Sequence, residues 1–162
     1  MSRLIEQWFL FFVWLITLAS LLFIPKEKYR VALLVFLFKQ CVTWVLGLLV
    51  VEWGWIVYPV RLFGKVNGTS FTFEYFVYPV ISIFFILHYP ERRGIGVKLA
   101  YYAAFTTGIM IPEYVIERYT GLIDYLYWTW YWSWISLFLT FGVSRWFYVW
   151  YFKPVRPDKI KP

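Results

Sequence analysis

IPEYVIERYTGLIDYLYWTWYWSW, residues 111–134, is the most informative stretch of the chain. It contains three of the nine acidic residues, Glu113, Glu117 and Asp124, together with four tryptophans and five tyrosines. Carboxylates and amphipathic aromatic rings gather where an apolar medium meets water. The stretch therefore predicts the end of one membrane helix, a short loop, and the beginning of the next helix.

The composition of the whole chain favours the same interpretation. Of 162 residues, 62% are hydrophobic and 26% are aromatic, whereas soluble domains are about 45–50% apolar. A bilayer removes the need to cover such a surface from water. We predict an all-α membrane protein with a single transmembrane helical domain over residues 1–152, followed by a basic, disordered cytoplasmic tail over residues 153–162.

Five apolar stretches predict about five transmembrane helices: residues 8–24, 31–51, 71–89, 97–116 and 130–152. Each approaches the roughly 20 residues that cross a hydrocarbon core. The first stretch is also compatible with a cleaved signal peptide. It ends in Leu-Phe-Ile-Pro, without the usual small-residue cleavage pattern, so we expect a retained helix.

The distribution of basic residues predicts the orientation. Ten of the sixteen Lys and Arg residues fall on the side of the C-terminus, four fall on the side of the N-terminus, and Lys39 and Arg145 lie within spans. Cytoplasmic loops are enriched in Lys and Arg, which places the N-terminus outside and the C-terminus in the cytoplasm. The net charge of +7 then indicates contact with anionic membrane lipids, not nucleic acid.

A candidate polar cluster lies at the predicted outer side. Glu113 and Glu117 are four residues apart and so share one helix face. The cluster would suit a cation, a metal or a proton-coupled site; the alternative is a set of ordinary interfacial acids, some of them paired to Arg118 and Arg61. Its members are Glu74, Glu113, Glu117, Asp124, Arg61 and Arg118.

A second candidate site combines Lys39, Gln40 and Arg145 at the cytoplasmic side. Counted along their helices, Lys39 and Arg145 lie roughly 10–12 Å deep, where no acid is expected. They would hold an anionic headgroup or another anion, unless both long side chains snorkel to the cytoplasmic surface.

Other features narrow the function less sharply. Ala100, Ala104 and Gly108 recur every four residues, and such a stripe of small side chains allows close helix packing, within the chain or in a homo-oligomer. The tetrapeptide VYPV occurs at 57–60 and again at 77–80, each time after a glutamate, and we infer no inverted repeat from it.

With one cysteine, Cys41, and one histidine, His88, the chain offers no Cys- or His-based metal site. No P-loop, nucleophile elbow or zinc-protease motif occurs, and we expect no cofactor.

Four segments together resemble a known family. They are YPVRLFGK at 58–65, FEYFVYP at 73–79, ERYTGLIDY at 117–125 and WTWYWS at 128–133. The chain is similar to small multipass membrane proteins of endospore-forming Gram-positive bacteria, over nearly its whole length from Val31. The resemblance implies a bacterial plasma membrane and carries over no activity or catalytic residue.

These observations favour a non-enzymatic membrane protein with an interaction or lipid-binding role. The alternative is a small, oligomeric transporter or channel that uses the outer carboxylates, and an integral-membrane enzyme is third. A lipid-binding protein requires a groove open to the bilayer near Lys39 and Arg145. A transporter requires a path from Glu74 and Glu113 toward these cations, and an enzyme requires carboxylates that converge on a pocket.

Overall fold

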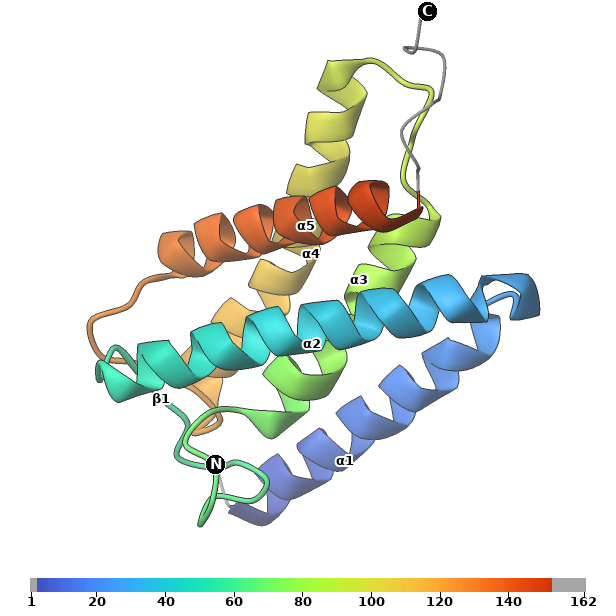
Figure 1. Ribbon diagram of the computed structural model, residues 1–162. Helices are drawn as coiled ribbons and strands as arrows, with labels where there is room; N and C mark the ends of the chain where they lie inside the picture. Colours follow the sequence, from blue (N-terminus) through green and yellow to red (C-terminus); the bar gives the residue numbers. More distant parts are fainter. Residues whose placement is uncertain (1–2, 153–162) are drawn as a thin grey trace, which may run out of the picture.

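The computed structural model describes residues 3–152 and contains five α-helices in that range (Figure 1). The predicted tail at 153–162 lies outside the described residues. The prediction of an all-α fold with five helices is confirmed. The helices are α1 (Arg3–Ser20), α2 (Tyr29–Glu52), α3 (Tyr78–Leu87), α4 (Ile95–Tyr119) and α5 (Trp130–Phe152).

Short elements complete the path of the chain. Two 3-10 turns, Leu21–Phe23 and Lys26–Lys28, join α1 to α2. A π-helical turn, η3 (Phe73–Val77), leads directly into α3. The strands β1 (Ile56–Val57) and β2 (Asp124–Tyr125) pair antiparallel and tie the α2–α3 connection to the α4–α5 connection.

Helix α2 occupies the middle of the molecule, with α3 packed against it and α5 beside both, while α1 lies at the edge (Figure 1). Aromatic side chains fill the interior, and Phe85 and Phe141 are completely buried with ring centroids 4.5 Å apart. Helix α1 is held by Trp14, whose ring stacks on Phe76 at 4.2 Å and whose indole N–H donates to Thr72. Aromatic packing therefore joins α3 to α5 and α1 to the π-helical turn η3.

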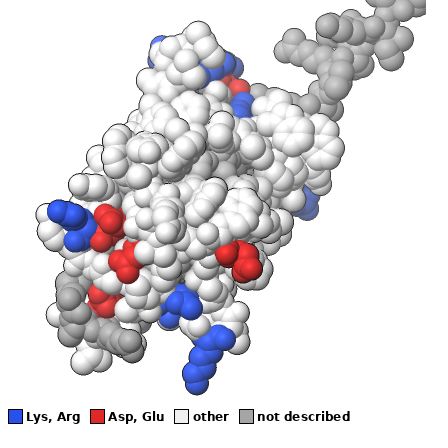
Figure 2. All heavy atoms as spheres, turned by 90° about the vertical axis from the view of Figure 1, so that its left-hand side faces the viewer, with Lys and Arg blue, Asp and Glu red and all other residues white. Residues whose placement is uncertain are grey.

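Two helical segments of the described chain are long and apolar enough to cross a membrane: Leu4–Phe23 and Lys26–Glu52. In the most apolar 18 consecutive residues of each segment, only 11% and 22% of the residues are buried. Most of the apolar side chains of both segments are therefore at least partly exposed. Phe73–Leu87 is a shorter apolar helix. Charged side chains gather toward the two ends of the face in Figure 2, with a largely uncharged surface between them.

Candidate functional site

Glu74 lies in the π-helical turn and points into the bundle toward α2. The hydroxyl of Tyr58 donates to Glu74 Oε1 at 2.7 Å, and the hydroxyl of Thr69 donates to Oε2. On α2 the carboxylate faces Gly47, where an added methyl carbon would collide with both carboxylate oxygens. The carboxylate therefore occupies the space that any other residue at position 47 would fill.

The backbone around Glu74 is supported by two polar residues of α2. Pro79 has no N–H to donate, so the carbonyl of Tyr75 lacks its usual helical partner. The side-chain amide of Gln40 donates to this carbonyl at 2.9 Å, and Thr43 Oγ1 donates to the carbonyl of Glu74 at 2.6 Å. Gln40, predicted as part of an anion site, thus has a structural partner instead.

Glu113 of α4 is also held by hydroxyl groups. The hydroxyl of Tyr78 donates to Oε2 at 2.8 Å, and the hydroxyls of Tyr125 and Ser133 donate to Oε1, the latter at 2.6 Å. The indole N–H of Trp128 donates to the Ser133 hydroxyl at 2.8 Å. Four segments, α3, α4, α5 and the strand β2, therefore meet at this one carboxylate.

The two glutamates line one hollow, which we call the acidic cavity. It has a volume of about 250 Å³ and is bounded by Thr43, Gly47, Tyr58, Glu74, Tyr78, Glu113, Ser133 and Thr140, with Trp53, Trp55 and Trp128 around one end. Glu74 is 7% exposed and Glu113 is 8% exposed. Residues far apart in the sequence thus bring two buried carboxylates to one space.

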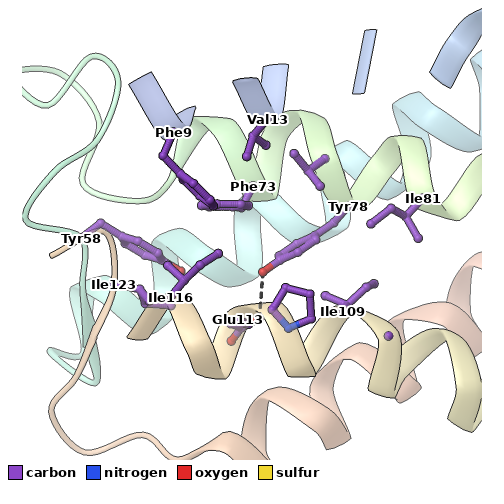
Figure 3. Close-up of a pocket in the computed structure, with 13 residues that line it drawn as sticks. Phe9, Val13, Tyr58, Phe73, Tyr78, Ile81, Ile109, Glu113, Ile116 and Ile123 are labelled. Carbon is purple, nitrogen blue, oxygen red and sulfur yellow. Dashed lines mark hydrogen bonds between the residues drawn. The ribbon is translucent and has the colours of Figure 1, made fainter. Parts of the chain in front are cut away.

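A second hollow, the apolar cavity, meets the first at a shared wall. Its volume is about 200 Å³, and it lies between α1, α3 and α4 (Figure 3). Phe9, Val13, Phe73, Val77, Ile81, Ile109 and Ile116 give it an almost wholly hydrocarbon lining. Tyr58, Tyr78 and Glu113 border both cavities and supply the polar side chains of the apolar one.

Among residues 3–152, no basic side chain forms an ion pair with Glu74 or Glu113. Arg145 and Glu91 form an ion pair, and neither of them lines the acidic cavity. The donors are hydroxyl groups, and three of these, on Tyr58, Thr69 and Tyr125, lie in the connections outside the helices. Burial raises the pKa of Tyr58, and the charge of Glu74 raises it further; burial and the charge of Glu113 act likewise on the pKa of Tyr125. Both tyrosines therefore keep their protons and remain hydrogen-bond donors.

The other members of the predicted outer cluster lie away from the acidic cavity. Arg61 donates to the carbonyls of Tyr58, Gly64 and Asn67 and so organises its own loop. Arg118 and Asp124 are exposed, and Glu117 is half-buried. The alternative of acids paired to arginines does not apply to Glu74 and Glu113, whose hydrogen-bond donors are tyrosine, serine and threonine hydroxyls.

Lys39 lies deeper in the bundle and is 0% exposed. Its ammonium group donates to Thr140 Oγ1 at 2.6 Å and lies 4.6 Å from the centre of the Phe141 ring. Snorkelling is therefore wrong for Lys39. Thr140 also lines the acidic cavity, whereas Lys39 does not. Lys39 therefore contacts the lining of that cavity through Thr140.

Arg145 has a protein counter-charge, contrary to expectation. Its guanidinium pairs with Glu91 from the α3–α4 connection and lies over the rings of Tyr89 and Tyr148, at 4.1 and 5.0 Å. Glu91 lies between the predicted spans 71–89 and 97–116, and the fold brings this connection to α5. Lys39 and Arg145 thus have separate partners in the protein, and the joint anion site stays a prediction.

The residues that sequence reasoning missed are the hydroxyl donors and Gly47. One signal was present: Tyr58 and Tyr78 are the tyrosines of the two VYPV segments, and each binds one of the two glutamates. The predicted small-residue stripe lies on α4, with nothing within 4 Å of a methyl carbon built on Gly108.

Comparison of the chain with protein-family models, with curated proteins and with solved structures gives no match. The resemblance to small membrane proteins of endospore-forming bacteria therefore remains a prediction. The geometry of the acidic cavity is the main guide to the function of this chain.

Proposed function

We propose that the chain is a multipass plasma-membrane protein that binds a cation in the acidic cavity and acts as a small transporter. The observation that carries this proposal is the convergence of Glu74 and Glu113, two buried carboxylates without a basic partner in residues 3–152, on one hollow. Carboxyl groups without a basic partner in a low-dielectric interior are stabilised by binding either a proton or another cation. This moves the transporter ahead of the lipid-binding role that the sequence favoured.

The burial of Lys39 also favours the transporter over the lipid-binding role. A lipid site at Lys39 would require access from the bilayer, and its side chain is completely enclosed. The path that a transporter requires is supported in part, since the acidic cavity extends from the tryptophans at one end to Thr140, the partner of Lys39. The lipid-binding role keeps no comparable observation.

For the topology we propose five spans with the N-terminus outside and the C-terminus in the cytoplasm. Helices α4 and α5 have 25 and 23 residues, which at ~1.5 Å per residue gives about 37 and 35 Å, enough for a hydrocarbon core of ~30 Å. The four tyrosines of α4, and the five tryptophans and three tyrosines of α5, lower the hydropathy of these helices but suit membrane interfaces. The resemblance to proteins of endospore-forming bacteria adds a bacterial plasma membrane.

Cysteine accessibility tests this topology. In a Cys41→Ser background, an impermeant maleimide should label Val66→Cys in intact cells and Arg93→Cys only after permeabilisation. Labelling of Arg93→Cys alone in intact cells would contradict the orientation. Labelling of both sites in intact cells would contradict an odd number of spans between them.

Binding of tetramethylammonium to the protein in nanodiscs tests the function. We expect saturable binding, lost in Glu74→Gln and in Glu113→Gln and retained in Glu52→Gln, since Glu52 is an exposed carboxylate at the end of α2. Uptake of the same ion into proteoliposomes should follow the same order. Equal binding by all four proteins, or no binding by any, would rule out the acidic cavity as a cation site.

An interaction role is the second candidate, and it is favoured by the stripe of Ala100, Ala104 and Gly108, all three of which are exposed. Small side chains let a second helix approach closely, and a second copy of this chain is the simplest partner. Native mass spectrometry from mild detergent should then show a discrete oligomer that Ala104→Leu dissociates. A wild-type monomer would remove this candidate.

A further inference from the structure

We infer that the ligand of the acidic cavity is an amphipathic organic cation, with its charged head at Glu74 and Glu113 and its apolar arm in the apolar cavity. The inference rests on the proposed function and names its substrate class. A small inorganic ion is a poorer candidate, because residues 3–152 contain no group of three or more His, Cys, Asp or Glu side chains that could hold a metal.

Each of the two hollows is small for an organic ligand. Pockets for such molecules typically have volumes of about 300–1,000 Å³. The cavities have about 250 and about 200 Å³, so each by itself is below that range. Tyr58, Tyr78 and Glu113 border both cavities, and a ligand that passes between these side chains by displacing the Tyr78 hydroxyl from Glu113 would use both volumes.

The linings of the two hollows differ in chemistry. Tryptophan rings surround one end of the acidic cavity, and the rings of Trp55 and Trp128 stack at 5.7 Å. Ring faces of this kind attract organic ammonium groups. The apolar cavity offers hydrocarbon walls that end at the Glu113 carboxylate (Figure 3), which matches a molecule with one charged end and one apolar end.

The position of α1 suggests how such a ligand enters. Phe9 and Val13 of α1 form one side of the apolar cavity, and α1 is an edge helix (Figures 1 and 3). The outward side of α1 carries exposed apolar side chains, among them Trp8, Phe12 and Ile16. An amphipathic cation dissolved in the bilayer would therefore reach the cavity by passing beside α1.

The test compares two probes that share a head and differ in the arm. Tetramethylammonium has the head alone, and (4-phenylbutyl)trimethylammonium adds an apolar arm; binding to the protein in nanodiscs is corrected with empty nanodiscs. We expect the armed probe to bind about tenfold or more tightly, since even small apolar groups in a fitted pocket give such factors.

Variants then assign the arm to the apolar cavity. Val13→Phe fills that cavity and should abolish the gain from the arm while tetramethylammonium still binds as in the wild type. Val45→Phe makes the same change on an exposed face of α2 and should alter neither affinity. Val77→Phe fills the same cavity from η3 and serves as the second variant if Val13→Phe does not fold.

The outcomes separate this inference from the function on which it rests. If tetramethylammonium binds but the arm gives no gain, or if the gain persists in Val13→Phe and Val77→Phe, the inference is overturned and the cation site stands. If neither probe binds the wild type, both are overturned. A gain lost in the two cavity variants and retained in Val45→Phe supports the inference.

Discussion

Tyr58 and Tyr78 occupy the same place in the two VYPV segments, and each donates a hydrogen bond to a different buried glutamate. Tyr58 binds Glu74 at 2.7 Å from the connection between α2 and η3, and Tyr78 binds Glu113 at 2.8 Å from the first turn of α3. The two tyrosines also line the wall between the acidic and apolar cavities. They therefore position both carboxylates and border both hollows.

Removing either hydroxyl should weaken the fold measurably. Tyr58→Phe and Tyr78→Phe each take a donor from a buried carboxylate, and we expect each to lower the free energy of unfolding by about 1–3 kcal/mol. Tyr127→Phe is the control, because Tyr127 is 82% exposed. Unfolding in a detergent–SDS titration measures the difference, and equal stability of all three variants would show that these hydrogen bonds contribute nothing.

Gly47→Ala should lower the free energy of unfolding of the wild type but raise it when position 74 is alanine. In the wild type the new methyl group collides with the Glu74 carboxylate, and overpacking of this kind costs about 1–3 kcal/mol. In a Glu74→Ala background the collision is gone, and alanine stabilises a helix by about 1 kcal/mol relative to glycine. The same unfolding titration on the wild type, Gly47→Ala, Glu74→Ala and the double variant measures the effect of Gly47→Ala in each background. Equal effects in the two backgrounds would contradict the contact between position 47 and Glu74.

Thr140 should matter only while Lys39 is present. Thr140→Val removes the oxygen that accepts from the buried ammonium group, and an unsatisfied buried donor costs about 1–3 kcal/mol. Lys39→Met removes the charge and keeps an unbranched chain, and replacement of buried charges by apolar residues is often neutral or stabilising. In the same unfolding titration, we expect Lys39→Met to be at least as stable as the wild type, and Thr140→Val to be nearly silent in that background. A full loss from Thr140→Val in the Lys39→Met protein would contradict the coupling.

Gln40 should stabilise the turn before Pro79 without contributing to cation binding. Gln40→Leu leaves the Tyr75 carbonyl without its donor, and we expect a loss of about 1–3 kcal/mol in the free energy of unfolding. Gln7→Leu, at an exposed position of α1, is the control. A Gln40→Leu protein as stable as the wild type would show that this carbonyl has another source of hydrogen bonding.

Glu6 should anchor α1 to the end of α4. Its carboxylate accepts from the N–H of Gly121 at 2.7 Å and is 3% exposed. Glu6→Ala removes this acceptor, so hydrogen exchange at the Gly121 amide should become faster, whereas Glu6→Gln retains an acceptor oxygen and should change it less. Unchanged exchange in both variants would mean that α1 is held by its aromatic contacts alone.

The sequence by itself determined the class of the fold. Apolar stretches of helical length, the position of the turns and the aromatic boundary at residues 111–134 are local properties, so the five helices could be placed without knowledge of their packing. The sequence also singled out Glu74 and Glu113 as candidate site residues, because carboxylates inside apolar stretches are costly unless they are used.

The tertiary structure alone decided which residues meet. The pairing of Glu91 with Arg145, the burial of Lys39 against Thr140 and the space that Gly47 leaves for Glu74 all join different segments of the chain. Hydrogen bonds and cavities depend on distances between side chains that are far apart in sequence, and periodicity along one helix carries no such distance. For this reason the hydroxyl donors replaced the arginines expected from the sequence, and the two cavities emerged only once the helices were packed.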